Sequence, residues 1–250
     1  MSFSFNQFLY LWIGIAVFTF VLLFFITAPY GRHNRKGWGP QVDNKWGWII
    51  MELVSPFALS VFFLGGEGVK NNAVWLFYLL WMFHYTYRSV IFPFMLNTKG
   101  KTIPFSIVFM AIFFNSVNGY TNGYYFGNFG TDYELYSFSS IQFLGGLLLF
   151  IVGFYIHFRS DRILIALRKN NAGYVIPNEF LFKKVANPNY LGELTEWLGF
   201  AIMTGALSAW CFWAWTIANL VPRAITNYQW YRNKFEDYPK GRKILIPGIF

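Results

Sequence analysis

Seven apolar stretches, each close to the length of a membrane-spanning helix, constrain the fold of this 250-residue chain more than any other feature. A helix needs about 20 predominantly apolar residues to cross the hydrocarbon core of a bilayer. Charged residues make up only 12% of the sequence, against about 25% in a typical soluble protein. The stretches are residues 4–28, 46–65, 71–95, 103–120, 139–158, 188–204 and 207–230. The sequence therefore predicts an all-α integral membrane protein, a seven-transmembrane-helix bundle that forms a single domain over residues 1–250.

The first stretch is predicted to be a retained helix and not a secretory signal. A signal peptide has a basic start, a shorter apolar core and a small-residue cleavage site. Residues 4–28 carry no charge, and no basic residue precedes them. We expect the remaining six stretches to follow it in one bundle within the lipid bilayer.

Basic residues segregate to alternate loops of this bundle. Of the 20 Lys and Arg residues, 18 fall after the first, third and fifth stretches or in the C-terminal region. Cytoplasmic loops of membrane proteins carry such an excess of basic residues. We therefore expect the N-terminus outside and the C-terminus in the cytoplasm. Since the net charge of +9 follows from this segregation, we do not expect nucleic acid as a partner.

Apart from Arg223, which is counted with the basic C-terminal region, four charged side chains lie inside the apolar stretches, namely Glu52, Arg88, Glu193 and Glu196. A charge at the bilayer centre costs about 2.5–3.5 kcal/mol on insertion scales, so such residues usually face the bundle interior and mark a site. The alternative is a structural ion pair between Arg88 and one glutamate. One arginine cannot neutralise three carboxylates, so the alternative does not account for the whole set.

Two helical stripes contain these charges. Residues three or four apart lie on one face of a helix. The first stripe is Tyr78, Trp81, Tyr85 and Arg88, and the second is Asn189, Glu193, Glu196, Trp197 and Phe200. Asn187 has the position of an N-cap and Pro188 that of a first helical residue, so Glu193 lies about 7–9 Å along the helix. We expect its carboxylate at the cytoplasmic mouth, facing hydroxyl or amide groups of a polar ligand.

Two arginines near helix ends, Arg168 and Arg223, suit the phosphates of such a ligand. A guanidinium offers a planar fork of donors that matches phosphate oxygens. The sequence contains neither a glycine-rich dinucleotide fingerprint after a strand nor a phosphate-binding P-loop. A nucleotide would therefore be held by side chains of the bundle.

The number of cysteines and the spacing of the histidines argue against a disulfide and against a metal site. Cys211 is the only cysteine, so no internal disulfide can form. The histidines, His33, His84 and His157, show no metal-ligand spacing. We expect no metal.

Several segments resemble the steroid 5α-reductase family, and the resemblance covers nearly the whole chain. It is strongest over residues 153–250, with the sequences NPNYLGELTEWLGFA and NYQWYRNKFEDYPKGRKILIPGIF. The segments SDRILIALRK, FHYTYRS and YGRHN are also similar to that family. The C-terminal ending is specific, whereas PNYLGE also has counterparts in other sterol reductases and in isoprenylcysteine carboxyl methyltransferases.

The resemblance implies an NADPH-dependent 3-oxo-5α-steroid 4-dehydrogenase, an oxidoreductase that reduces the Δ4 double bond of 3-oxo-Δ4 steroids. Glu52 and Tyr85 match the family's pair of carbonyl-binding catalytic residues. A donor aimed at the carbonyl oxygen stabilises the negative charge that develops there. The alternative for Tyr85 is an aromatic side chain that only packs, in a chain with 16 tyrosines.

The family's NADPH contacts also carry over onto matching positions. They are Tyr30, Arg32, Asn118, Asp161, Arg168, Tyr174, Asn189, Glu193, Glu196, Trp197, Arg223 and Tyr231. The chain departs from the family pattern at Met51 and Met110, which replace polar residues, and at His157 and Asn227, where the pattern has other polar residues.

Three other interpretations stay open. The substrate is a different apolar conjugated molecule, such as a polyprenol or an enoyl-thioester; or the protein is an isoprenylcysteine-type methyltransferase using S-adenosylmethionine; or it binds or transports lipid without catalysis. The Glu193 and Glu196 pair and the specific tail count against the methyltransferase. Few polar residues in the first, fourth and seventh stretches count against transport. We expect a bacterial member of the family, acting as a monomer in the inner membrane, or in the endoplasmic reticulum if the source is eukaryotic.

Overall fold

The computed structural model describes residues 4–98, 100–171 and 173–250. Lys99, one of the basic loop residues counted above, lies outside the described residues. The chain divides into two compact units, which are described separately. Unit 1 is Met1–Thr27 with Ile141–Phe250, and unit 2 is Ala28–Ser140.

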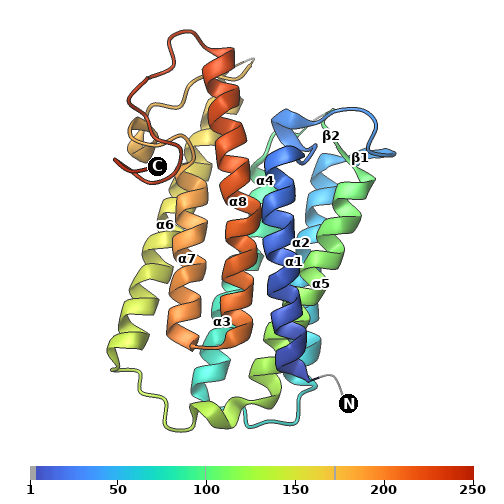
Figure 1. Ribbon diagram of the computed structural model, residues 1–250, viewed down its shortest axis with the longest axis vertical. Helices are drawn as coiled ribbons and strands as arrows, with labels where there is room; N and C mark the ends of the chain where they lie inside the picture. Colours follow the sequence, from blue (N-terminus) through green and yellow to red (C-terminus); the bar gives the residue numbers. More distant parts are fainter. Residues whose placement is uncertain (1–3, 99, 172) are drawn as a thin grey trace. The chain divides into compact units, whose positions relative to one another are not determined.

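Unit 1 consists mainly of four helices (Figure 1). They are α1 (Phe5–Phe25), α6 (Ile141–Asn170), α7 (Pro188–Thr204) and α8 (Leu207–Lys234), with a short 3₁₀ helix η4 (Phe180–Lys183) before α7. α1 packs along α8, and α6 packs along α7. Gly205, with φ of 66°, ends α7 in the left-handed conformation that glycine adopts freely. The hairpin between α7 and α8 is therefore tight, with only Gly205 and Ala206 between the two helices.

Unit 2 contains the remaining elements. They are η1 (Gly31–His33), β1 (Gln41–Asp43), α2 (Asn44–Leu64), α3 (Asn72–Thr86), η2 (Tyr87–Ile91), α4 (Phe92–Met95), β2 (Thr102–Pro104), α5 (Phe105–Asn128) and η3 (Gly130–Tyr133). β1 and β2 form a small antiparallel pair in which Val42 lies opposite Ile103. α2 begins where Asp43 accepts the backbone N–H groups of Lys45 and Trp46, and it runs along α5.

Glycines bring the helices of each pair into backbone contact. In unit 2, a Cβ at Gly123 of α5 would lie 2.5 Å from the carbonyl oxygen of Leu59 on α2. In unit 1, a Cβ at Gly192 of α7 would overlap the backbone nitrogen of His157 on α6, and one at Gly153 would overlap that of Glu196. Small residues at such positions allow the close helix packing that is common in membranes.

All seven predicted stretches are helical, but two of the helices run well beyond their predicted ends. The fourth helix continues to Asn128 and the fifth to Asn170. Asp161 and Arg168 therefore lie on α6 and not in a loop. Charged residues end an apolar stretch, but they do not end a helix, because Arg and Lys are good helix formers.

Three described helices, α1, α2 and α6, are long and apolar enough to cross a membrane. On α1 large apolar side chains point outward, with Phe18 67% and Phe25 82% exposed. An apolar surface of this kind is unusual in a protein surrounded by water. The all-helical architecture is that of a membrane protein.

Candidate functional site

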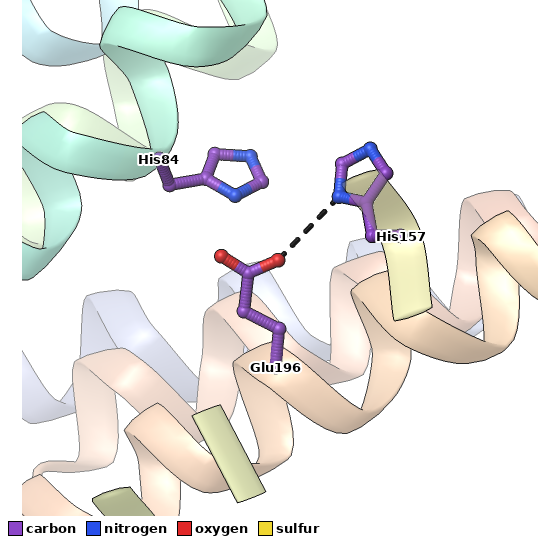
Figure 2. Close-up of side chains that lie close together, drawn as sticks. All are labelled: His84, His157 and Glu196. Carbon is purple, nitrogen blue, oxygen red and sulfur yellow. Dashed lines mark hydrogen bonds and ion pairs between the residues drawn. The ribbon is translucent and has the colours of Figure 1, made fainter. Parts of the chain in front are cut away.

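A cluster of one histidine and three carboxylates lies where α6 and α7 meet in unit 1. His157 Nε2 is 3.1 Å from Asp161 Oδ2 and 4.0 Å from Glu193 Oε2. His157 Nδ1 is 3.5 Å from Glu196 Oε2, as Figure 2 shows. The side chains of His157 and Glu196 are 1% and 0% exposed. We call these four residues the carboxylate cluster.

The carboxylate cluster follows from the local backbone. His157 and Asp161 are four residues apart on α6, so they share one face. The contacts at Gly153 and Gly192 bring that face against the turn of α7 that carries Glu196. A larger residue at either glycine would separate His157 from Glu196. The glycines of both helices are therefore part of the architecture of the site.

Both ring nitrogens of His157 face carboxylate oxygens. A neutral imidazole has a single N–H, whereas an imidazolium has two. The contacts therefore require either a doubly protonated ring or a protonated carboxyl group in the cluster. Carboxylate oxygens accept hydrogen bonds, so they suit the hydroxyl or amide donors of a ligand and disfavour phosphate.

Arginine and aromatic side chains form a second group in unit 1. The guanidinium of Arg168, near the end of α6, lies 5.8 Å from the ring centroid of Tyr174, within the range of a cation–π contact. Tyr174 is in turn 4.9 Å from Trp230 of α8, edge to face. The ring of Trp230 is 5.2 Å from that of Tyr231, which is 3% exposed. The predicted contact residues Arg168, Tyr174 and Tyr231 thus lie in one group. Trp230, which contacts both tyrosines, was not predicted from the sequence.

Asn187 is the N-cap residue of α7 and Pro188 begins the helix, as predicted, but the Asn187 side chain makes no capping hydrogen bond. Its amide instead donates to the carbonyl oxygens of Ala224 (3.0 Å) and Ile244 (3.1 Å). Asn227 donates to Asn187 Oδ1 at 3.1 Å. A side chain that bonds two distant carbonyl groups cannot also reach its own helix. Asn187 therefore ties the start of α7 to α8 and to the C-terminal segment.

The other predicted residues of unit 1 lie on the same elements. Arg223, 7% exposed, is on α8 one residue before Ala224, to which Asn187 is bonded. Trp197 is 1% exposed and packs edge to face on Phe212 at 4.6 Å. Asn189 is half-buried in the first turn of α7. Trp197 is therefore part of the core, whereas Asn189 is accessible to a ligand.

In unit 2, the stripe predicted on the third stretch faces α2. The Tyr78 hydroxyl is 3.0 Å from Ser60 Oγ, and Trp81 Nε1 donates to Ser55 Oγ at 3.2 Å. Arg88 Nη2 lies 3.8 Å from Glu52 Oε1. The structural ion pair weighed above is thus present. The Arg88 guanidinium also lies 5.0 Å from the ring centroid of Trp48.

Tyr85 is 3% exposed and stacks on Trp81, with 5.5 Å between ring centroids. Immediately after it the helix widens into the π-helical segment η2, which contains Arg88. Such segments often occur at functional sites. Pro93, two residues after η2, lacks the N–H that a regular helix would use. Apart from this proline, no feature of the sequence predicts the π-helix.

The remaining predicted residues of unit 2 are separated along the chain. Tyr30 packs against the apolar cluster that contains Met51 and Ile103. Arg32 lies on η1. Asn118 is fully buried on α5, where its amide donates to the Phe114 carbonyl. Of the two methionine departures, Met51 is buried whereas Met110 is 48% exposed, so only Met51 lies in the interior of the unit.

Comparison with known proteins gives matches over nearly the whole chain. A family model described as 3-oxo-5-alpha-steroid 4-dehydrogenase matches residues 101–250. A steroid 5-alpha-reductase DET2 of Gossypium hirsutum is 41% identical over 243 residues, 94% of this chain and 93% of the relative. A 3-oxo-5-alpha-steroid 4-dehydrogenase 1 of Bos taurus is 34% identical over 249 residues, 96% of this chain and 95% of the relative. These relatives come from a plant and a mammal, so they give no support to the expected bacterial origin.

Proposed function

We propose the following function for this chain, which belongs to the 3-oxo-5-alpha-steroid 4-dehydrogenase family: NADPH-dependent reduction of the Δ4 carbon–carbon double bond of 3-oxo-Δ4 steroids. The product is the 5α-reduced 3-oxo steroid. The single observation that carries the proposal is identity of 34–41% with steroid reductases over more than nine-tenths of the chain.

The residues of unit 1 fit NADPH by their chemistry. Arg168 and Arg223 are assigned to the phosphates, because guanidinium groups bind phosphate oxygens in a fork. The carboxylate cluster is assigned to hydroxyl and amide groups, because it offers acceptors. Tyr174 and Tyr231 offer aromatic faces. When bound, NADPH supplies the hydride that is added to the β-carbon of the enone.

The remaining assigned contacts are proposed on the same family match. They are Tyr30, Arg32, Asn118, Asn189 and Trp197, besides Asp161, Glu193 and Glu196 of the carboxylate cluster assigned above. Because Trp197 is buried against Phe212, its role in this proposal is to support Glu196 on the same helix. Asn118, buried on α5, is assigned to the nicotinamide end.

Glu52 and Tyr85 are assigned to the steroid carbonyl. As the double bond is reduced, negative charge develops on the carbonyl oxygen, and hydrogen-bond donors lower its energy. A tyrosine hydroxyl donates without a change of charge, whereas a carboxyl group donates only when it carries its proton. Glu52 must be ionised to pair with Arg88 and protonated to donate to substrate. In this proposal it therefore leaves Arg88 when the steroid binds.

The alternatives are less favoured. Both relatives quoted above are named for action on steroids, which counts against polyprenol or enoyl-thioester reduction. A methyltransferase would bind S-adenosylmethionine and would not consume NADPH. Lipid transport without catalysis would leave the buried carboxylate cluster without a role.

We further propose that the seven helical stretches all span the membrane, with the N-terminus outside and the C-terminus in the cytoplasm, in a monomer. The segregation of 18 basic residues supports this orientation. Reporter fusions at residues 97–102 and 170–185 test it, because both segments should lie in the cytoplasm. A fusion reporting either segment outside contradicts the orientation.

The decisive experiment mixes purified full-length protein, NADPH and a 3-oxo-Δ4 steroid. The absorbance at 340 nm should fall, and mass spectrometry of the product should show the gain of two hydrogens. Controls omit the steroid or use a steroid already saturated at that bond. No NADPH consumption, together with methyl transfer from S-adenosylmethionine, would establish the methyltransferase alternative.

A further inference from the structure

His157 is the one member of the carboxylate cluster without an assigned role. It lies on α6 at 1% exposure, and both of its ring nitrogens face carboxylate oxygens, on Asp161 at 3.1 Å and on Glu196 at 3.5 Å. The two bonding directions of an imidazole are fixed by the ring. One side chain therefore sets the position of two carboxylates, one on each helix (Figure 2 shows the Glu196 side).

The position of His157 is itself determined by the backbone. A Cβ at Gly192 would overlap the nitrogen of His157, so the two helices touch at this residue. Glu193 and Glu196 follow on the next turn of α7. The contact between the helices thus fixes the place of His157, and His157 in turn places the carboxylate oxygens of the cluster.

The carboxylate oxygens of the cluster suit one part of NADPH better than the other. Carboxylate oxygens accept hydrogen bonds and repel phosphate. Both halves carry donors: a ribose diol and a carboxamide in the nicotinamide–ribose half, and an amino group and one ribose hydroxyl in the adenosine half. Only the adenosine half also carries the extra phosphate, which carboxylates repel. The cluster therefore matches the nicotinamide–ribose half, and Arg168 matches the phosphates.

We propose that His157 is a positioning residue that holds Asp161 and Glu196 in place to bind the nicotinamide–ribose half of the cofactor. This inference rests on the proposed function. It goes beyond that function by giving His157 a role and by dividing the cofactor between the carboxylate cluster and the arginines. His157 acts through the carboxylates and need not touch the cofactor.

The test measures direct binding of two ligands to purified full-length protein, NADPH and 2′,5′-ADP, which represents the adenosine half. His157→Ala should weaken NADPH binding about tenfold or more, as expected when charged hydrogen bonds are lost. It should leave 2′,5′-ADP within about twofold, whereas Arg168→Ala should weaken both ligands. His157→Asn, whose amide lies near the original Nδ1, and His157→Gln, whose amide lies near Nε2, should each recover part of the affinity.

The matched control is Gln142→Ala. Gln142 is on α6 and donates to the carbonyl of Ile202 on α7 at 2.9 Å, so its loss weakens the same helix pair far from the cluster. It should lower thermal stability and leave both ligands bound as in the parent. Should His157→Ala fail to fold, His157→Gln and His157→Asn carry the comparison, and each should bind NADPH more weakly than the parent does.

The possible results separate the two proposals. Parent-like NADPH binding in the His157 variants, or equal weakening of NADPH and 2′,5′-ADP, would overturn the role of His157 and leave the proposed function intact. An equal loss of NADPH binding in Gln142→Ala would mean that His157 acts only through the packing of α6 on α7. A parent protein that binds no NADPH overturns the proposed function, and this inference with it.

Discussion

The two units hold their charged side chains in different ways. In unit 1, His157 contacts carboxylates on two helices, and the glycine contacts of α6 and α7 fix its place. In unit 2, Glu52 and Arg88 form a pair at 3.8 Å, with side chains 13–14% exposed. That separation exceeds a hydrogen bond, so the pair is easily exchanged for another partner. A rigid cluster suits a group that binds the same cofactor in every cycle, whereas a loose pair suits a residue that must release one partner for another.

The largest expected effect is on the loose pair. Glu52→Leu should reduce the rate about 10²- to 10³-fold, as does the loss of a donor to a developing oxyanion. Glu52→Gln keeps an N–H donor and should be milder. Tyr85→Phe should resemble Glu52→Leu, and the double variant should show much less than the sum of the two losses. Steady-state kinetics measure the rate, and direct NADPH binding should stay close to that of the parent.

Arg88 provides the control for this prediction. If Glu52 only neutralises Arg88, Glu52→Leu should lose stability, and Arg88→Met should restore it. Full activity of Glu52→Leu would remove Glu52 from the carbonyl site. The Glu52–Arg88 pair would then be a structural ion pair without a part in catalysis.

The arginines of unit 1 should give the next largest effect. Arg168→Ala or Arg223→Ala removes a charged hydrogen bond to phosphate, worth about 1.5–3 kcal/mol, so the NADPH constant should rise about tenfold to a hundredfold. Titration of NADPH at a saturating steroid concentration measures it. The KM for the steroid should change little. Arg162→Ala, at an exposed position on the same helix, is the matched control, and parent-like NADPH binding in all three variants would mean that these arginines serve topology only.

Adding a methyl group to the glycine contacts compares the two units directly. Gly192→Ala and Gly123→Ala each force a Cβ against backbone atoms of the partner helix, and each should destabilise the protein by about 1–3 kcal/mol. Only Gly192→Ala should also weaken NADPH binding, because it displaces His157. Thermal unfolding and NADPH titration of both variants measure the two effects. Equal loss of NADPH binding in both would show that the cluster is no more sensitive to helix spacing than the rest of the protein.

The smallest expected effect concerns a contact between α2 and α3. Tyr78→Phe removes the 3.0 Å contact with Ser60 Oγ and should cost about 0.5–1.5 kcal/mol of stability. The rate and both substrate constants should remain those of the parent. A change of steroid KM in this variant would extend the substrate site from Glu52 along α2.

The sequence predicted the helices well, because long apolar stretches have few other solutions, and the stripe from Tyr78 to Arg88 does face α2. The end of α6 was missed because hydropathy reports where a chain leaves lipid and not where its helix stops. The N-cap position of Asn187 was predicted, but the bonds of its side chain were not, since its partners at Ala224 and Ile244 are distant in sequence. A lone histidine such as His157 carries no periodic signal. The α7 carboxylates that face it can be identified only from the structure, in which Gly153 and Gly192 allow α6 and α7 to come into contact.

The unbroken course of α6 through residues 141–170 has one more consequence. Its length, about 45 Å at 1.5 Å per residue, exceeds the hydrocarbon core of a bilayer by about 15 Å. Asp161 and Arg168 therefore lie on one rigid rod, about 10 Å apart along its axis, with no hinge in the described helix between them. The helix fixes the distance between Asp161 and Arg168, so a ligand that binds both residues must span that distance. A shorter or more flexible dinucleotide analogue would have to give up one of the two contacts.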